Sequence, residues 1–295
     1  NDYVEKNKVG LVMQKKLMSK SDNIRNPDII WREIKLLEEG ANKLVDEFKI
    51  SLAHNMSASK FHVIYGYISK LTKGDKTTRI LDYGCGGGTM VTYLRLLGYE
   101  NIVGVDINKG KLYNLDLIHR KMGFNKDVFF SYNGIFLPLE DLSFDLIISQ
   151  QVLEHVLNVE QYFNECNRVL DHKGKILLDF PHRIVPFDTH TRMWFVHYLP
   201  FGMRKYIYNR YRGDDFSKKL NLNPIWFYKK LLNKVFLSVE CVTTNRIASF
   251  SYKENYEGNT ALRSAVNSLF NIPLVGKYIN KFLSIFFNAT LIVSK

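Results

Sequence analysis

The sequence predicts an α/β fold built on a doubly wound, mostly parallel sheet. Three observations support this fold class. An apolar strand runs directly into a glycine-rich turn and then a helix between residues 79 and 97. A second strand, at 102–106, ends in a carboxylate. Strand-like and helix-like segments then alternate up to residue 180, as in a parallel sheet that helices cover on both faces.

The glycine-rich turn at 84–88, with the sequence G-C-G-G-G, is the most informative stretch. Residues 79–81 before it are typical of a short buried strand, and residues 90–97 after it are typical of a helix with one apolar face. Glycines allow positive φ angles and a close approach of the backbone. The N-terminus of the helix adds N–H groups that can point at a ligand. We therefore expect a nucleotide-like ligand at this turn.

Asp106 ends the second strand, eighteen residues after Gly88. An acid at this place accepts hydrogen bonds from a ribose diol in doubly wound folds, whereas the alternative is a solvated aspartate that merely closes a strand. The spacing argues against two other nucleotide motifs. The dinucleotide fingerprint needs a third glycine where Thr89–Val91 stand, and a phosphate-binding loop needs a lysine, which is absent between Lys76 and Lys109.

The stretch D-Y-G-C-G-G-G at 82–88 resembles the first motif of class I S-adenosylmethionine-dependent methyltransferases. Later motifs match that family in order across residues 60–180, including N-G-I-F-L-P at 133–138, a fourth strand at 144–149 and Q-Q-V-L-E-H-V at 150–156. The resemblance implies a Rossmann-like sheet of seven strands with an antiparallel last strand, a transferase of class EC 2.1.1 and S-adenosyl-L-methionine as cofactor. Methyl transfer from a sulfonium needs no metal ion, and the sequence shows no cluster of metal ligands, so we expect none. The residues that it implies for cofactor binding are Asp82, Tyr83, Gly84, Cys85, Gly86, Gly88, Asp106, Ile107, Asn133, Gly134 and Gln150.

Two positions depart from the family pattern. Asn133 stands where the family usually has the aspartate that contacts the adenine amino group. His172 replaces a proline that is common before the glycine of the turn leading to the fifth strand. The first departure affects the expected adenine contact, and the second affects only a turn.

The net charge of +12 is concentrated in the last part of the chain. Residues 1–180 hold 24 Lys and Arg against 23 Asp and Glu, whereas residues 181–295 hold 17 against 6 and also 21 of the 40 aromatic residues. A basic, aromatic surface attracts anionic partners and buries apolar ones. The alternative is an ordinary solvated basic face.

The three cysteines are widely spaced and form no metal-ligand pair, which is typical of a reducing cytoplasm. The N-terminal residues show no signal-peptide pattern, and no apolar stretch approaches the roughly 18 residues that span a bilayer. We therefore expect a cytoplasmic protein, with the inner surface of a membrane as the alternative location.

We divide the chain into four parts by its patterns: a lead-in and helix at 1–56, the cofactor-binding core at 57–180, a basic aromatic insertion at 181–235, and closing strands with a second small insertion at 236–295. Residues 181–223 show neither helical nor strand periodicity, so they are either an ordered wall or a lid. The remaining expected elements are a helix that begins at Pro27 and runs through Phe48, helices at 57–71, 224–235 and 273–282, and strands at 236–244 and 285–294.

Three histidines compete as the base that a hydroxyl acceptor would need. His155 follows the fourth strand, where the cleft of the resembled family opens, and His182 follows the fifth. His190 lies two residues after Asp188, which could orient the imidazole and stabilise its charged form. Each has a structural alternative, such as packing, capping or a loop hydrogen bond. We assign His190, Asp188 and His155 as the candidate catalytic residues.

The stretch at 180–200 resembles a methyltransferase subgroup encoded with surface-glycan assembly enzymes, through a pattern like P-N-R-x(3)-[ED]-x-H…x-H-W-L-P. His182 stands for the asparagine and Tyr198 for the tryptophan. The resemblance implies O-methylation of a sugar or glycolipid hydroxyl by in-line displacement. The stretch around Lys277, Lys281 and Phe286 could also rest on a membrane near a lipid-linked substrate, or its phenylalanines could belong to the core.

Three other functions stay open. The L-E-H-V motif is shared with quinone-biosynthesis O-methyltransferases, whose acceptor is a phenol. The basic aromatic segment could instead track RNA, although no RNA-binding module is recognisable and we do not expect a nucleic-acid partner. A cofactor-binding partner subunit without catalysis is the alternative outside the enzymes. The sequence indicates neither the methylated atom nor the oligomeric state.

Overall fold

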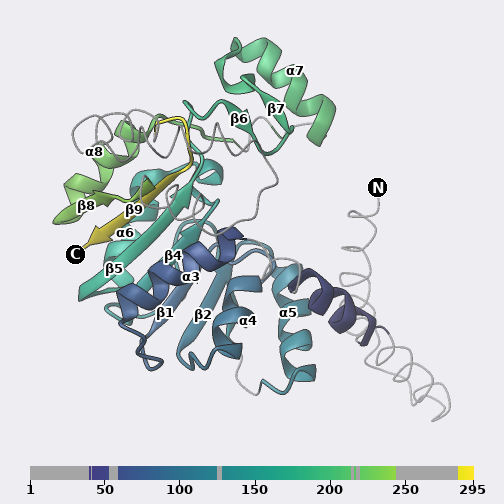
Figure 1. The fold of residues 1–295 in the computed structure, drawn as a ribbon, viewed down its shortest axis with the longest axis vertical. Helices are drawn as coiled ribbons and strands as arrows, with labels where there is room; N and C mark the ends of the chain where they lie inside the picture. Colours follow the sequence, from purple (N-terminus) through teal and green to yellow (C-terminus); the bar gives the residue numbers. More distant parts are fainter. Residues whose placement is uncertain are drawn as a thin grey trace, which may run out of the picture.

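The computed structural model describes residue 40 and residues 42–52, 59–124, 128–213, 216, 220–243 and 285–295. Seven of the described strands form one sheet in the order β3-β2-β1-β4-β5-β9-β8 (Figure 1). Strand β9 is antiparallel to both of its neighbours, and the other neighbouring strands are parallel. The predicted fold class is therefore confirmed. The strands are β1 Ile80–Tyr83, β2 Ile102–Asp106, β3 Phe129–Ser131, β4 Phe144–Gln150, β5 Leu170–Phe180, β8 Ser238–Cys241 and β9 Ala289–Ser294.

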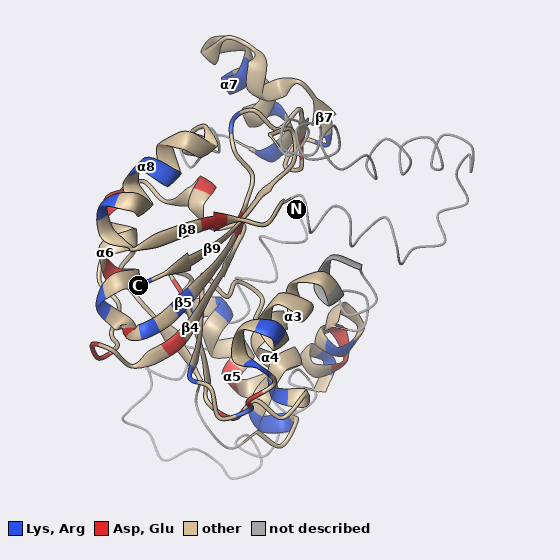
Figure 2. Ribbon diagram, turned by 60° about the vertical axis from the view of Figure 1, so that its left-hand side comes forward, with Lys and Arg blue, Asp and Glu red and all other residues tan. Residues whose placement is uncertain are grey.

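Helices cover both faces of this sheet, as Figure 2 shows with the sheet seen nearly edge-on. One face carries α3 (Ser59–Thr72), α4 (Thr89–Leu96) and α5 (Lys109–Lys121), and the other carries α6 (Val159–Val169) and α8 (Ile225–Val235). Successive side chains of a strand point to opposite faces. The strands therefore contribute alternately to two hydrophobic cores, and both cores are fully buried at the centre of the sheet.

Most expected elements of the core appear within a few residues of their predicted bounds. The helix expected at 224–235 is α8, which begins after Pro224, and the last two strands are shorter than expected. Residues 42–52 are helical and bury Val45, Phe48 and Leu52, in agreement with the last part of the expected first helix. The earlier part of that helix and the helix expected at 273–282 lie outside the described residues.

Residues 181–213, which we call the hairpin-helix segment, lie beyond the carboxyl end of β5 (Figure 1). The segment contains a short hairpin of β6 (Phe187–Asp188) and β7 (Met193–Trp194), the 3-10 turn η2 (Val196–Tyr198) and helix α7 (Phe201–Arg212). The sequence pattern did not indicate α7, because this helix buries only Tyr208 and therefore has no repeating apolar stripe. No helix in the described parts of the chain has the length and apolar character needed to cross a bilayer.

Candidate active site

The glycine turn is joined to the second strand by backbone hydrogen bonds. The N–H groups of Gly84 and Cys85 both donate to the carbonyl of Val105, at 2.8 and 3.0 Å. Gly88 stands at the N-cap of α4 with φ 66°, and its N–H donates to the Cys85 carbonyl at 2.8 Å. The strand, the turn and the start of the helix therefore form one unit at the carboxyl edge of the sheet, where doubly wound folds bind their ligands.

Two glycines of the turn are needed for different reasons. Gly84 has φ +84°, and a Cβ built on it would lie 2.4 Å from Cγ2 of Val152, closer than real atoms pack. Gly86 has φ +54°, but its Cβ would meet only a backbone oxygen at 4.0 Å and would otherwise point into open space. Gly84 is thus required by packing, whereas Gly86 is required by its backbone conformation and leaves room beside it for a ligand.

Asp106 lies directly beside this open space. Its carboxylate accepts the Gly86 N–H through Oδ2 at 3.0 Å and the Asn108 N–H through Oδ1 at 2.9 Å. Each oxygen has a further lone pair for a ligand hydroxyl. Asp82, inside β1, is buried, and this burial together with the nearby Asp106 raises its pKa to about 7. A cation bound here would favour the ionised form of Asp82.

The opposite wall of the site follows β3. The Asn133 side-chain oxygen accepts hydrogen bonds from the N–H groups of Ile135 and Phe136 at 2.9 and 2.8 Å. These hydrogen bonds fix the conformation of the loop. Gly134 has φ +84° and a Cβ there would lie 3.9 Å from the Ile107 side chain. Ile107, Ile135 and Phe136 are each more than half exposed. They form an apolar surface suited to the face of a flat ring.

Helix α6 holds this wall in place through two residues that the sequence patterns did not single out. The buried Glu165 carboxylate accepts the Leu137 N–H at 2.8 Å and pairs with the Arg168 guanidinium at 2.8 Å. Arg168 also donates to the Leu139 carbonyl at 2.8 Å and to Asp141 at 2.7 Å. Hydrogen bonding to Arg168 holds the pKa of Glu165 below its usual value. Nothing in the local sequence distinguishes these charges from ordinary helix-surface pairs.

Two of the expected cofactor residues turn their side chains away from the site. The Tyr83 ring is buried and stacks on Tyr162, with ring centroids 4.2 Å apart. The Cys85 side chain is buried against Gly104, where a Cβ would lie 2.9 Å from its Sγ, and burial raises the pKa of the thiol. Both residues lie on the expected turn, but only their backbone atoms remain for the cofactor contact that we expected.

The turn after β4 is sharper than its sequence indicated. Gln150 ends β4 and pairs in register with Asp179 of β5. Gln151 has the left-handed φ of +56° without being a glycine, and its N–H donates to the Asp179 carbonyl at 2.7 Å while its side chain donates to the carboxylate at 3.2 Å. These bonds stabilise the strained backbone. The following 3-10 turn η1 (Leu153–His155) consequently begins at the carboxyl edge of the sheet.

The structure brings two of the candidate histidines together. His155 ends η1 and His190 lies in the turn after β6, and their ring centroids are 5.4 Å apart. Phe216 packs on both rings, at 6.5 and 5.2 Å between centroids. The buried Glu154 belongs to the same cluster, because ligand atoms of Glu154, His155 and His190 all lie within 4.8 Å of one another. Such a set could also bind a divalent ion, so the expectation that no metal takes part stays a prediction.

Among the described residues, no hydrogen bond joins the Asp188 carboxylate to the His190 ring, although the charge of Asp188 acts to raise the pKa of that ring. The Asp188 carboxylate, only 1% exposed, accepts the Thr191 hydroxyl at 2.6 Å and the backbone N–H groups of His190 and Thr191 at 3.3 and 3.1 Å. The ring that it contacts belongs to His197, whose Nε2 lies 3.3 Å from Oδ1 and whose Nδ1 faces the Val185 carbonyl at 2.9 Å. Asp188 is therefore a positioning residue of the turn that carries His190.

The protonation of these groups follows from their burial. Burial lowers the pKa of His190 to about 4, although the charge of Asp188 acts in the opposite direction. Burial also lowers the pKa of His182 to about 4, and this residue is completely buried. For Asp188, burial favours a raised pKa, but hydrogen bonds from His197 and Thr191 outweigh it and hold the pKa below its usual value. His190 is thus a neutral imidazole at neutral pH.

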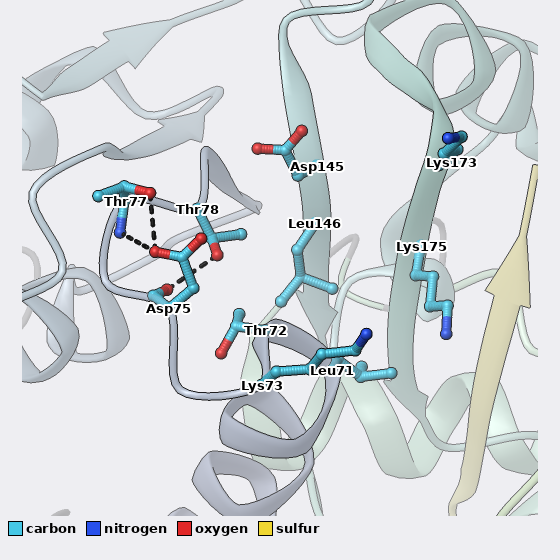
Figure 3. Close-up of a pocket in the computed structure, with 10 residues that line it drawn as sticks. All are labelled: Leu71, Thr72, Lys73, Asp75, Thr77, Thr78, Asp145, Leu146, Lys173 and Lys175. Carbon is cyan, nitrogen blue, oxygen red and sulfur yellow. Dashed lines mark hydrogen bonds between the residues drawn. The ribbon is translucent and has the colours of Figure 1, made fainter.

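A separate depression lies at the opposite edge of the sheet (Figure 3). Its volume is about 370 Å³, and its lining includes Lys73, Asp145 and Lys175. These residues lie before or near the amino ends of the parallel strands. Ligands of doubly wound sheets bind at the carboxyl ends instead. The histidine cluster and the glycine turn therefore remain the candidate site.

Comparison with known proteins gives matches over the part of the chain that contains the glycine turn. A family model described as a methyltransferase domain matches residues 81–178. The chain is 28% identical over 105 residues to a candidate S-adenosylmethionine-dependent methyltransferase of Mycolicibacterium smegmatis, covering 36% of this chain and 38% of the relative. It is 31% identical over 113 residues to the ubiquinone biosynthesis O-methyltransferase of Dinoroseobacter shibae, covering 38% and 45%. The chain thus spans less than half the length of these curated relatives.

Among solved structures, a candidate sarcosine dimethylglycine methyltransferase of Galdieria sulphuraria is 15% identical, with coverage of 80% of this chain and 83% of that one and a TM-score of 0.49. A score at this level carries no weight of its own, so the fold assignment rests on the strand order given above.

The residues at the carboxyl edge fit the cofactor of this family. The carboxylate of Asp106 suits a ribose diol, the open space beside Gly86 admits a ligand close to the backbone, and the exposed side chains of Ile107 and Phe136 suit a purine face. When bound, S-adenosylmethionine supplies a methyl group on a positively charged sulfonium. Residues 81–178 therefore resemble the core of a class I S-adenosylmethionine-dependent methyltransferase domain.

Proposed function

We propose that this protein transfers the methyl group of S-adenosylmethionine to a hydroxyl of a sugar or glycolipid, with His190 as the base. The observation that carries the proposal is the contact between His155 and His190. They come from two segments far apart in the sequence, yet their rings meet beside the carboxyl end of β4. A hydroxyl acceptor needs such a base, because it does not lose its proton unaided.

The state of His190 supports its role as a proton acceptor. Its Nε2 is buried and has no hydrogen-bond partner in the described parts of the chain. Its lowered pKa of about 4 leaves the imidazole neutral near pH 7, so a lone pair is available for the acceptor hydroxyl. For the methyl transfer itself, the protein must also hold the methyl group and the acceptor oxygen about 3 Å apart and exclude water. Phe216, which covers both rings, is suited to exclude water.

The sugar acceptor is supported by the hairpin-helix segment. Trp194, Tyr198 and Tyr206 expose aromatic faces that can stack on sugar rings, and the same segment carries exposed arginines that can meet phosphates or uronates. A phenolic acceptor is the second candidate, because the Dinoroseobacter relative acts in ubiquinone biosynthesis. A phenol would place less demand on the base, since its pKa is near 10.

The test is a single-turnover assay with radiolabelled donor and three acceptor pools: lipid-linked glycan, a quinone precursor and total RNA. We expect label in the glycan pool. The variant His190→Gln should lower the turnover number about 100-fold or more while the affinity for S-adenosylmethionine stays unchanged. His172→Gln is the matched control, since His172 is exposed at the other edge of the sheet. Label only in the quinone precursor or in RNA, or full activity of His190→Gln, would contradict the proposal.

The pH profile gives a second test of the same base. A base must be unprotonated, so its activity is lost as the pH falls through its pKa. For His190 that loss should occur near pH 4, and the rate should be nearly constant between pH 6 and pH 8. A histidine with an ordinary pKa of about 6.5 would instead give half of the maximal rate near that pH. A half-maximum near pH 6.5 would assign the proton transfer to another group.

A further inference from the structure

The hairpin-helix segment exposes an unusual number of large side chains. Seven apolar or aromatic residues between 194 and 211 are each more than half exposed: Trp194, Phe195, Tyr198, Phe201, Met203, Tyr206 and Tyr211. Single exposed apolar residues are normal on a protein surface, but a concentration of them marks a surface that contacts something else. Of the residues in α7, only Tyr208 is buried. Most of the surface of this helix is therefore left uncovered by the described residues.

Among the described residues of this segment, the exposed charges have one sign. Residues 181–213 contain the exposed Arg183, Arg192, Lys205, Arg210 and Arg212, together with the half-buried Arg204. The single acid in this range is Asp188, which is buried and engaged by Thr191 and His197. Figure 2 shows the basic positions along α7 without an acidic one. Such a surface attracts anionic partners.

The exposed rings are held in place by the polar cluster beneath them. Phe195 adopts the left-handed φ of +63° and its N–H donates to the Pro186 carbonyl. The Tyr198 hydroxyl donates to the Ile184 carbonyl, and His197 between them is fixed by Asp188. A non-glycine residue in this conformation persists only where its surroundings impose it. The aromatic side chains are thus presented by a fixed backbone.

We propose that the hairpin-helix segment docks on the surface of an anionic lipid bilayer. Tryptophan and tyrosine prefer the boundary between headgroups and acyl chains, and basic residues beside them are attracted to lipid phosphates. Phe201 and Met203 are uncharged and exposed, and they would bury apolar surface in lipid. Because the segment also carries His190, docking would bring the site to the membrane surface. Only this placement of the catalytic site at the membrane rests on the proposed function; the docking itself does not.

The test uses the full chain and vesicles made of equal amounts of phosphatidylcholine and phosphatidylglycerol, without methyl donor. Wild-type protein should co-sediment with these vesicles, bind phosphatidylcholine vesicles much less, and dissociate as salt is raised. The double variant Trp194→Ala/Phe201→Ala should bind about tenfold more weakly or worse. Lys205→Glu should weaken binding mainly at low salt. The matched control is Trp226→Ala, because Trp226 on α8 is 61% exposed, close to the 63% of Trp194.

Circular dichroism and S-adenosylmethionine binding of the variants show that the fold is retained. Equal loss of vesicle binding in Trp226→Ala, absence of vesicle binding by the wild type, or tighter binding to an RNA homopolymer than to vesicles would each overturn the proposal. Vesicle binding is measured without catalysis. Failure of glycan methylation therefore leaves this result unaffected, and failure of docking leaves the assignment of His190 unaffected.

Discussion

The glycine turn and the hairpin-helix segment both contain residues with positive φ angles, but the residue types differ. In the turn, left-handed φ angles fall on glycines, at 84, 86 and 88. In the hairpin-helix segment one falls on Gly213, which ends α7, but two fall on the non-glycine residues Arg192 and Phe195. A non-glycine residue in such a conformation costs about 1–3 kcal/mol. The glycines therefore leave the turn unstrained at the place where a ligand would contact backbone atoms. The hairpin-helix segment instead carries strained non-glycine residues, whose side chains lie on its surface.

The two regions also differ in what supports them. The glycine turn is held by short-range backbone hydrogen bonds to Val105 of the neighbouring strand. In the hairpin-helix segment, the buried Asp188 carboxylate is contacted by the His190 N–H, the Thr191 hydroxyl and the His197 ring. A substitution in the turn should therefore destabilise the sheet as well. A substitution of Asp188 should destabilise only the hairpin-helix segment. The following predictions test this difference.

The largest effect is expected at Gly84. In Gly84→Ala the added Cβ would lie 2.4 Å from Val152, in a backbone conformation with φ +84°. Overpacking and left-handed strain together should lower the free energy of unfolding by about 2–4 kcal/mol. Urea denaturation followed by circular dichroism measures this. The control is Gly87→Ala, where the nearest atom would lie at 3.8 Å and no positive φ is imposed.

We expect the midpoint of Gly87→Ala to stay close to that of the wild type. If both variants lose stability equally, the packing of Gly84 against Val152 does not limit the turn. If neither loses stability, η1 can move away, and the turn is less firmly joined to the sheet than the hydrogen bonds indicate.

The sequence predicts the first region well because its signals are local. A strand, a turn and a helix that follow one another must be adjacent in space, so the proximity of Gly84, Gly86 and Asp106 follows from their spacing. The helix at 224–235 was likewise visible, since Ile225, Tyr228 and Leu232 repeat at helical spacing and pack on the core.

The second region was only partly predictable because its contacts are long-range. The spacing of Asp188 and His190 suggested a pair, but the carboxylate contacts the ring of His197, which η2 brings back to the hairpin. The meeting of His155 with His190 depends on the path of the chain after β5. Gln151 resembles any polar residue in sequence, and only the structure shows its positive φ. No local periodicity encodes these contacts.

The second prediction is a loss of cofactor affinity in Asp106→Ala, a variant that we expect to keep the fold. Asp106→Ala removes the acceptor that lies between the glycine turn and the expected ribose, so S-adenosylmethionine should bind about 100-fold more weakly, as expected for losing a charge-assisted hydrogen bond. Isothermal titration calorimetry measures the dissociation constant. The control is Asp75→Ala, a carboxylate at the opposite edge of the sheet that accepts hydrogen bonds only from Thr77 among the described residues. Unchanged affinity in Asp106→Ala would place the ribose elsewhere.

The smallest effect is expected from Asp188→Asn, which keeps the shape of the side chain but removes its charge. The pKa of Asp188 lies below its usual value, so the ionised carboxylate stabilises the folded state above about pH 3.9, the pKa of an unfolded aspartate, and this stabilisation is lost as the pH falls through the lower folded value. The variant should therefore be about 1–2 kcal/mol less stable at pH 7, and the difference from wild type should shrink as the pH falls below about 4. Hydrogen exchange at pH 7 should show the loss confined to residues 187–198. Loss of protection that extends into β1 and β4 would contradict the local support of the hairpin-helix segment and would make both regions one cooperative unit.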